Sequence, residues 1–307
     1  MLGNTVAVLG AGAVGCYFGG LLARAGQKVT LIGRARHVDA INADGLFFEG
    51  LQFQERIRVR ATTDVSAAHD ADLVLFCVKT VDTEEAARLL STDSLAVSLQ
   101  NGVDNVARIK SAAGIEVIPS VVYVGAFMAG SGHVKHTGRG DLVIGDVWGN
   151  ERLRQSLPGI ANMFEGAGVP CRVSDNVEGE LWTKMIINCA YNAISALGRA
   201  KYAALVSDPL IRDLMQQVTG ESIAVALAGG VRLPEADMIT AVWKIGEALA
   251  GAMSSTAQDL ARGNHTEIDS LNGYIARRGA ELGVATPANE TLHALIKLRE
   301  ASLTPNT

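Results

Sequence analysis

A glycine-rich turn near the N-terminus constrains the fold more than any other feature of this chain. Thr5 to Leu9 (TVAVL) is a short apolar run, as expected of a buried parallel strand, and Gly10 to Gly15 (GAGAVG) follows it directly. A helical run from Val14 to Ala25 and a second strand-like run from Lys28 to Ile32 complete the unit. Strand, glycine turn, helix and strand within about 30 residues predict a Rossmann-type, doubly wound parallel sheet that binds a dinucleotide.

Each glycine of this turn has its own physical purpose. Gly10 permits the tight turn, Gly12 lets the backbone approach a pyrophosphate, and Gly15 lets the helix pack on the strand. The N-terminus of that helix adds free N–H groups and a positive dipole end. The alternative is a glycine-rich turn in an unrelated α/β protein. We therefore expect the whole turn to bind the cofactor: Gly10, Ala11, Gly12, Ala13, Val14 and Gly15.

The end of the second strand indicates which dinucleotide is bound. NAD-binding sites usually place Asp or Glu there, where the carboxylate holds the ribose 2′-hydroxyl. This chain has Gly33-Arg34-Ala35-Arg36 instead. A guanidinium suits a phosphate through charge-assisted forked hydrogen bonds, which favours NADP(H) with Arg34 at the 2′-phosphate. The alternative is that Arg34 and Arg36 are solvated surface cations.

Two further residues come directly after apolar, strand-like runs. Lys79 ends Leu73 to Val78 (LVLFCV), and Asn101 follows Leu95 to Leu99 (LAVSL) within Gln100-Asn101-Gly102. Ligands bind beyond the carboxyl ends of the strands in an open parallel sheet. We therefore expect Lys79 to meet the cofactor and Asn101 to lie near its nicotinamide end, although both could be ordinary turn residues.

The pattern changes near residue 173. Short strands with glycine turns between Glu116 and Gly145 predict antiparallel strands appended to the parallel sheet. Strand signals then vanish, and helices are expected at 176–198, 208–228, 235–252, 255–262, 267–282 and 287–302. The predicted domains are an NADP-binding Rossmann-type domain over 1–173 and an all-helical substrate and catalytic domain over 174–307.

A polar stripe runs along the first of these helices. Within Glu178 to Arg199 (EGELWTKMIINCAYNAISALGR), polar residues recur at every fourth position: Glu180, Lys184, Asn188 and Asn192. Four residues advance only about 40° around an α-helix, so these side chains form one line along an apolar rod. One alternative is a solvent-facing edge with a Glu180–Lys184 ion pair. Repeated Asn, a poor helix former, favours a stripe that faces a ligand.

Composition excludes several classes of protein. The net charge of -5 lacks the basic footprint of a nucleic-acid binder. No apolar run reaches the roughly 18 residues of a membrane span, and the N-terminus lacks the pattern of a signal peptide, so we expect a cytoplasmic protein.

The four cysteines form no CxxC pair, and His133 and His136 would point to opposite faces of a strand. We therefore expect no metal site.

A second polar cluster comprises Ser254-Ser255-Thr256 and His265 to Asp269 (HTEID). Taken locally, helix capping by Ser255 or Thr266 and a helix start at Glu267 explain it. Together with GAGAVG, Arg34, Val78-Lys79, Gln100-Asn101-Gly102 and ELWTK, however, the chain resembles the ketopantoate reductases (2-dehydropantoate 2-reductases) along essentially its whole length. That family reduces 2-dehydropantoate to pantoate with NADPH, on the route to pantothenate and coenzyme A.

The resemblance implies a role for each matching position. Lys184 matches the catalytic lysine and Glu267 a carboxylate of the active site. Substrate-binding positions are matched by Asn188, Asn192 and Ser255. Asn101 and Lys79 match positions near the nicotinamide ribose and the substrate, and Arg34 matches the contact to the 2′-phosphate.

A mechanism follows from the chemistry of the reaction. Hydride transfer to a ketone carbon builds negative charge on the oxygen, which a proton donor or cation stabilises. Lys184 can be both, while Asn188 and Asn192 fix polar groups of a 2-oxo acid and Ser255 donates to its carboxylate. The alternatives are a reductase of a different 2-oxo acid and a non-catalytic NADP(H)-binding sensor. The oligomeric state stays open, with a homodimer as one option.

Overall fold

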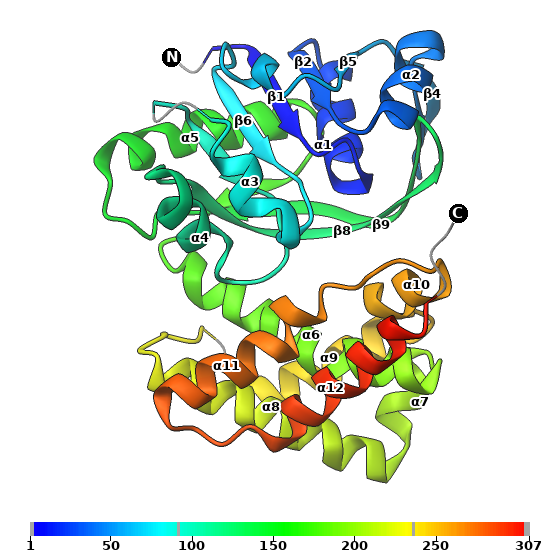
Figure 1. The fold of residues 1–307 in the computed structure, drawn as a ribbon, viewed down its shortest axis with the longest axis vertical. Coiled ribbons are helices and arrows are strands. Elements are labelled where there is room, and N and C mark those ends of the chain that lie inside the picture. Colours follow the sequence, from blue (N-terminus) through cyan, green and yellow to red (C-terminus); the bar gives the residue numbers. More distant parts are fainter. Residues whose placement is uncertain (1–2, 91–92, 235–236, 304–307) are drawn as a thin grey trace. The chain divides into compact units, whose positions relative to one another are not determined.

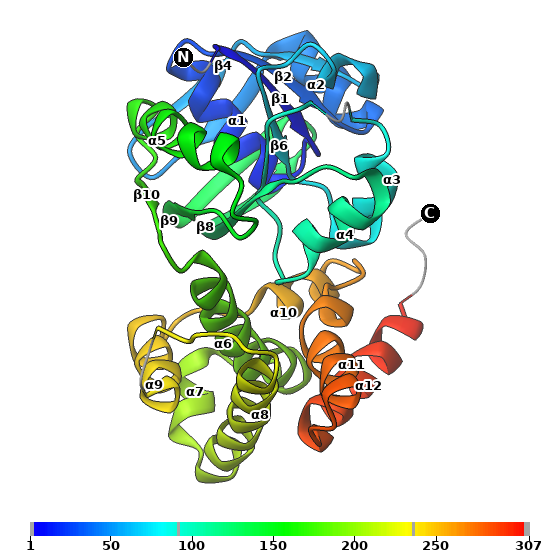
Figure 2. The same ribbon diagram turned by 90° about the vertical axis from the view of Figure 1, so that its left-hand side faces the viewer.

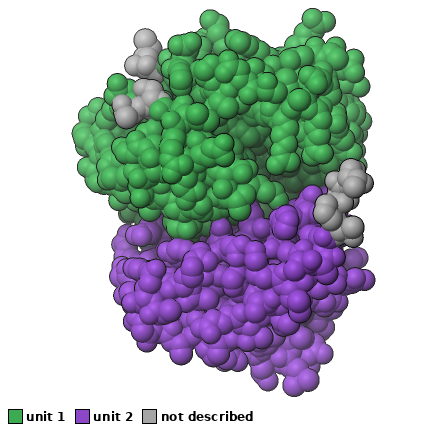
Figure 3. All heavy atoms as spheres, viewed as in Figure 1, with its two compact units in different colours: residues 1–177 green, residues 178–307 purple. Residues whose placement is uncertain are grey.

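The computed structural model describes residues 3–90, 93–234 and 237–303. Contacts between backbone positions divide the chain into two compact units, Met1–Val177 and Glu178–Thr307 (Figure 3). We call them unit 1 and unit 2 and describe each by itself. The domain boundary expected from the sequence, between residues 173 and 174, stays a prediction and lies close to this division.

Unit 1 is built on a sheet that contains a run of neighbouring parallel strands (Figure 1). Their order is β7-β6-β1-β2-β5, with bounds Ala96–Ser98, Leu73–Phe76, Thr5–Leu9, Lys28–Ile32 and Arg60–Thr62. Val6 and Val8 of β1 belong to one core cluster, whereas Ala7 and Leu9 belong to another. Because successive side chains of a strand point to opposite faces, both faces of this sheet are buried. This explains why its strands read as continuous apolar runs.

An antiparallel region extends the sheet beyond β7. Strand β8 (Ile118–Gly130) is parallel to β7 and antiparallel to β9 (His133–Ile144). Strands β3 (Leu46–Glu49) and β10 (Cys171–Val173) both pair with β9 in parallel, and β4 (Gln54–Ile57) pairs with β3 antiparallel. The prediction of a Rossmann-type sheet with appended antiparallel strands is confirmed. The short strands expected between Glu116 and Gly145 are instead two long strands, β8 and β9.

The helices of unit 1 are α1 (Ala13–Arg24), α2 (Ala35–Asp44), α3 (Thr83–Ala87), α4 (Asn105–Ala113) and α5 (Glu151–Gly166). Short 3-10 turns lie at η1 (Val65–Ala68) and η2 (Thr80–Asp82). Phe18 of α1 and Phe164 of α5 meet edge to face, with ring centroids 6.0 Å apart. This contact joins the two helices in the core cluster that also contains Val6 and Val8.

Among the described residues of unit 2, the regular elements are all helices (Figures 1 and 2). Its elements are α6 (Val177–Gly198), α7 (Tyr202–Ser207), α8 (Pro209–Ala228), α9 (Met238–Ala248), α10 (Ser255–Ala261), η3 (Ile268–Ser270), α11 (Asn272–Leu282) and α12 (Pro287–Ala301). Helix α12 begins at Pro287, where the expected helix 287–302 begins, and proline is favoured in the first turn of a helix. The sequence did not predict α7. The helix expected at 267–282 is split, and residues 235–236 of the expected helix 235–252 lie outside the described residues.

Helix α6 is the central packing element of unit 2. Cys189, Ala190 and Tyr191 are fully buried, and the Tyr191 hydroxyl donates to the Val242 carbonyl of α9 at 2.7 Å. The Asn272 amide of α11 donates to the Cys189 carbonyl at 3.2 Å. Two neighbouring helices are therefore tied directly to α6. Within the ranges that the structure covers, no helix combines the length and apolar character needed to cross a membrane.

Candidate active site

The glycine turn is tight because three strands meet around it. The amides of Gly10 and Ala11 both donate to the Ile32 carbonyl of β2, at 2.9 and 2.8 Å. Gly10 has φ +108°, and a Cβ there would lie 2.6 Å from the backbone carbon of Cys77. A Cβ on Gly15 would lie 2.1 Å from the Gly10 carbonyl oxygen. A larger side chain would clash at either position, which accounts for glycine at both.

Gly12 differs from its two neighbours in the motif. A Cβ there would meet no atom of the described residues within 4 Å. Gly12 is also the N-cap of α1, and the first amides of an α-helix have no partner within the helix. The open space beside Gly12 and these amides fit the approach of a pyrophosphate. The residues at this turn are thus compatible with a dinucleotide.

Arg34 lies where β2 ends and α2 begins. It is the N-cap residue of α2, and both it and Arg36 are exposed. The Arg36 Nε donates to Nε2 of His37 at 3.2 Å. Burial lowers the pKa of His37, and the charges of Arg36 and Arg34 lower it further, so this imidazole is neutral near pH 7. Arg36 therefore has a local partner, while Arg34 is the guanidinium at the strand end.

Lys79 and Asn101 follow adjacent strands of the same sheet. Phe76 of β6 is in register with Leu9 of β1 and with Ser98 of β7. Because these strands are parallel, the residues that follow them lie along one edge of the sheet. Lys79 is exposed and Asn101 is half-buried. The structure thus gathers the glycine turn, Arg34, Lys79 and Asn101 at the carboxyl edge of unit 1.

A buried polar network holds the two loops after β6 and β7. The side-chain amide of Gln100 donates to the Val78 carbonyl at 3.1 Å and to Thr83 Oγ1 at 2.7 Å. The side-chain amide of Asn105 donates to the backbone carbonyl of Asn101 at 2.6 Å. Gln100 and Asn105 therefore anchor the backbone around Lys79 and Asn101. No role for Gln100 is predicted from the sequence, because these hydrogen bonds form only when the two strand ends are adjacent.

In unit 2, the polar stripe lies on α6 as the four-residue spacing predicts. Glu180, Lys184 and Asn188 are half-buried, and Asn192 is buried with 3% of its surface exposed. The Asn192 amide approaches Ser255 Oγ at 3.4 Å, near the limit for a hydrogen bond. The fold thus brings two expected substrate-binding residues together, although they lie far apart in the sequence.

The interpretation of Ser255 as a helix cap is wrong. Ser254 caps α10, since its Oγ accepts from the Ala257 amide at 3.1 Å. The same hydroxyl donates to the Asn192 carbonyl at 3.0 Å. Ser255 is exposed at the start of α10. Capping therefore does not use the Ser255 hydroxyl, and Ser254 both caps α10 and bonds to α6.

Glu267 lies in the connection between α10 and α11. The helix start expected there is wrong in detail, because Glu267 precedes the 3-10 turn η3 and α11 begins at Asn272. Thr266 is not the N-cap of η3, which is Glu267, but Thr266 Oγ1 accepts from the Ile268 amide at 3.2 Å. Glu267 is half-buried. It lies on neither α6 nor α10.

The histidines of β9 contact different partners. His133 Nε2 lies 3.0 Å from Glu49 Oε2, whereas the ring of His136 packs on Tyr17 with centroids 4.7 Å apart. Among the described residues, no three His, Cys, Asp or Glu side chains are grouped so that they could hold a metal ion.

Comparisons with known proteins identify the family. The model of ketopantoate reductase PanE/ApbA matches residues 6–149, and the model of its C-terminal part matches residues 176–300. The chain belongs to the ketopantoate reductase family. Among curated ketopantoate reductases, the 2-dehydropantoate 2-reductase of Pyrococcus horikoshii is 34% identical over 297 residues, covering 96% of this chain and 97% of that protein. The corresponding enzyme of Archaeoglobus fulgidus is 33% identical over 300 residues, covering 97% and 98%.

Solved structures support the same placement. A PanE/ApbA family ketopantoate reductase from Ralstonia eutropha JMP134 has a TM-score of 0.91 and 50% identity, covering 97% of this chain and 99% of that one. D-mandelate dehydrogenase in complex with NADH and anilino(oxo)acetate has a TM-score of 0.90 and 25% identity, covering 97% and 99%. The resemblance seen in the sequence is thereby confirmed, together with the expected fold, an oxidoreductase activity and a nicotinamide cofactor.

Proposed function

We propose that this protein reduces a 2-oxo acid with NADPH, and that its substrate is 2-dehydropantoate, reduced to (R)-pantoate for pantothenate and coenzyme A synthesis. The observation that carries the proposal is the stripe on α6, where Lys184 and Asn188 precede an Asn192 that reaches Ser255. A dinucleotide-binding sensor would not need an amine and amides in line on a helix of the other unit. The names of the curated relatives support the choice of substrate.

Lys184 is the proposed general acid. The bound nicotinamide supplies the hydride. Negative charge then develops on the substrate oxygen, and a positioned ammonium group both stabilises that charge and donates the proton. The half-burial of Lys184 supports this role, because charges interact more strongly where water is partly excluded.

The remaining residues of unit 2 are proposed to hold the substrate. Asn188 and Asn192 offer amide donors and acceptors to its polar groups, and the exposed Ser255 hydroxyl can donate to its carboxylate. Glu267 is the proposed carboxylate of the site. In unit 1, Asn101 is proposed to contact substrate and cofactor, and Lys79 to contact the cofactor.

The proposed preference for NADPH depends on Arg34. The position after β2 carries an exposed guanidinium where an NAD-specific site usually carries a carboxylate. The glycine turn, Gly10 to Gly15, is proposed to hold the pyrophosphate. We further propose a cytoplasmic location, which agrees with the free state of all four cysteines.

The experiment is NADPH oxidation by the purified protein at low concentrations of 2-dehydropantoate, with NADH run in parallel. Saturable oxidation with NADPH favoured over NADH is expected. Tight NADPH binding without turnover on any 2-oxo acid would contradict the proposal and favour a sensor.

A reductase of another 2-oxo acid is the second candidate. The similarity to D-mandelate dehydrogenase favours it, because that protein was solved with a different oxo acid, anilino(oxo)acetate, on nearly the same fold. A panel of 2-oxo acids with aliphatic and aromatic side chains separates the candidates. A kcat/KM for benzoylformate above that for 2-dehydropantoate would select the second candidate.

A further inference from the structure

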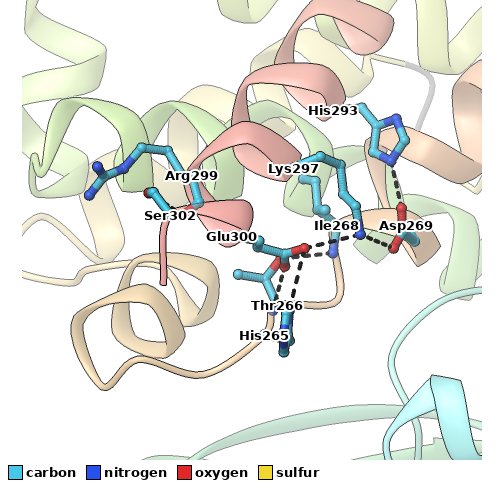
Figure 4. A network of polar contacts seen from close by, with 9 residues as sticks. All are labelled: His265, Thr266, Ile268, Asp269, His293, Lys297, Arg299, Glu300 and Ser302. Atoms are coloured by element: carbon cyan, nitrogen blue, oxygen red, sulfur yellow. Dashed lines mark hydrogen bonds and ion pairs between the residues drawn. The ribbon is translucent and has the colours of Figure 1, made fainter. Parts of the chain in front are cut away.

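The segment that carries Glu267 is tied on both sides to the C-terminal helix α12 (Figure 4). Thr266 precedes Glu267 and bonds to Glu300, while Asp269 follows it and bonds to His293 and Lys297. The mechanism proposed above uses no residue of α12. The proposed mechanism therefore does not explain why α12 bonds to both sides of Glu267.

Glu300 holds the first side of this segment. Its side chain is 5% exposed, and its Oε1 accepts from the Thr266 amide at 2.7 Å and from Thr266 Oγ1 at 2.6 Å. Burying a carboxylate costs several kcal/mol unless nearby groups compensate it. Two donors from one residue of the connection supply that compensation. A carboxylate at this position thus serves the connection rather than the apolar packing of α12.

Lys297 joins the two sides. Its Nζ lies 2.8 Å from Asp269 Oδ2 and 3.1 Å from Glu300 Oε2. His293 adds a contact of 2.6 Å from its Nε2 to Asp269 Oδ1. His293, Lys297 and Glu300 lie about one helical turn apart on α12. Together they bond to the segment before and after Glu267. The backbone of Glu267 is confined because both of its flanks are held.

We infer that α12 positions the Glu267 carboxylate for the reaction through Glu300 and Lys297. The inference rests on the proposed function, in which Glu267 belongs to the active site. Glu300 and Lys297 are positioning residues, since they act through the segment rather than on the substrate. A displacement of about 1 Å in an active-site group can cost about 10²-fold in rate.

The main test uses Glu300→Ala, in which the two donors of Thr266 lose their acceptor. Assays with 2-dehydropantoate and NADPH should show kcat reduced by about 10- to 100-fold, with the NADPH Kd unchanged. Glu290→Ala is the matched control, because it removes an exposed carboxylate of the same helix that accepts only at 3.0 Å from Thr286. Its kcat should equal that of the wild type.

A double-mutant cycle separates positioning from stability. If Glu300 acts through Glu267, then Glu300→Ala added to Glu267→Ala should cause no further loss of kcat. A purely structural role would reduce the amount of folded protein in both backgrounds alike. Multiplicative losses in the double variant would therefore overturn the inference.

Two further variants cover a failure of Glu300→Ala to fold. Glu300→Gln keeps an oxygen acceptor for Thr266 and should recover most of kcat. Lys297→Met changes a side chain that is 44% exposed and should lower kcat without loss of fold. Wild-type kcat in Lys297→Met, with unchanged amide exchange at 266–269, would refute the inference.

Amide hydrogen exchange measures whether the loss of Glu300 loosens the segment around Glu267. In Glu300→Ala, exchange at Thr266 and Ile268 should accelerate, whereas exchange in unit 1 should not change. If the wild type reduces no 2-oxo acid, the proposed function fails and the positioning role falls with it. If the wild type is active and Glu267→Ala is impaired but Glu300→Ala is not, the inference alone fails.

Discussion

At the scale of the residue, Lys184 carries the strongest chemical argument. It lies on α6 between the buried residues Trp182 and Met185, in a stripe whose other members are a carboxylate and amides. Lys184→Ala should lower kcat by about 10²- to 10⁴-fold, since it removes a general acid and a cation together. The NADPH Kd from fluorescence titration should hardly change, because the glycine turn belongs to unit 1. Turnover that survives this substitution would mean that another group donates the proton.

Arg34 is the second residue whose role can be measured alone. Arg34→Ala should weaken NADPH binding by about 10- to 100-fold, because hydrogen bonds between charged groups contribute about 1.5–3 kcal/mol. NADH lacks the 2′-phosphate and should lose little. Arg36→Ala is the comparison, since Arg36 Nε is already bonded to His37. Equal losses for both dinucleotides, or a larger effect at Arg36, would show that the 2′-phosphate lies elsewhere.

At the scale of the element, the contact between α12 and η3 should be sensitive to acid. Burial raises the pKa of Glu300, but hydrogen bonds from Thr266 and the neighbouring Lys297 outweigh it, so the net pKa is lowered. For Asp269, the donors Lys297 and His293 likewise outweigh burial and lower the pKa. A lowered folded-state pKa means that the charged carboxylates stabilise the fold above their unfolded pKa of about 4. That stability is lost as the pH falls through the folded-state values.

Glu300→Gln tests this acid sensitivity. Near pH 7 the variant should unfold with a free energy about 1–3 kcal/mol below that of the wild type. The difference should shrink as the pH falls below about 4, because the wild-type carboxylate is then protonated as well. Urea unfolding across a pH series measures both values. A difference that does not depend on pH would show that the charge of Glu300 contributes nothing.

At the scale of the whole molecule, the residues proposed for the site are divided between the two units. The expected cofactor-binding residues lie in unit 1. The expected substrate-binding residues of unit 2 are Asn188, Asn192 and Ser255, and unit 2 also contains Lys184 and Glu267. A ligand that binds only the native state adds about 2.7 kcal/mol of stability at 100 times its Kd. NADPH should therefore raise the calorimetric Tm more than NADH at equal concentration. If the units unfold separately, only the transition of unit 1 should move.

Local patterns predicted the elements that depend on neighbours in sequence. The run from β1 through α1 to β2 follows from apolar strands and a glycine turn, and α6 with its stripe follows from a four-residue period. Elements such as β4 and β5 are too short for a period to be read, and they form because they pair with β3 and β2. Helix α2 and helix α7 escaped prediction as well.

The sequence by itself therefore determined the fold class, the family and the residues that share α6, because periodicity and motif spacing are local properties. Only the tertiary structure decided that Ser254 rather than Ser255 caps α10, that Asn192 reaches Ser255, and that Glu300 holds Thr266. Asn192 and Ser255 are 63 positions apart in the sequence, and Thr266 and Glu300 are 34 positions apart. Ser254 and Ser255 are adjacent, so the sequence alone does not show which of them caps the helix. The physical reason is that a side-chain hydrogen bond forms only where packing brings donor and acceptor within about 3 Å.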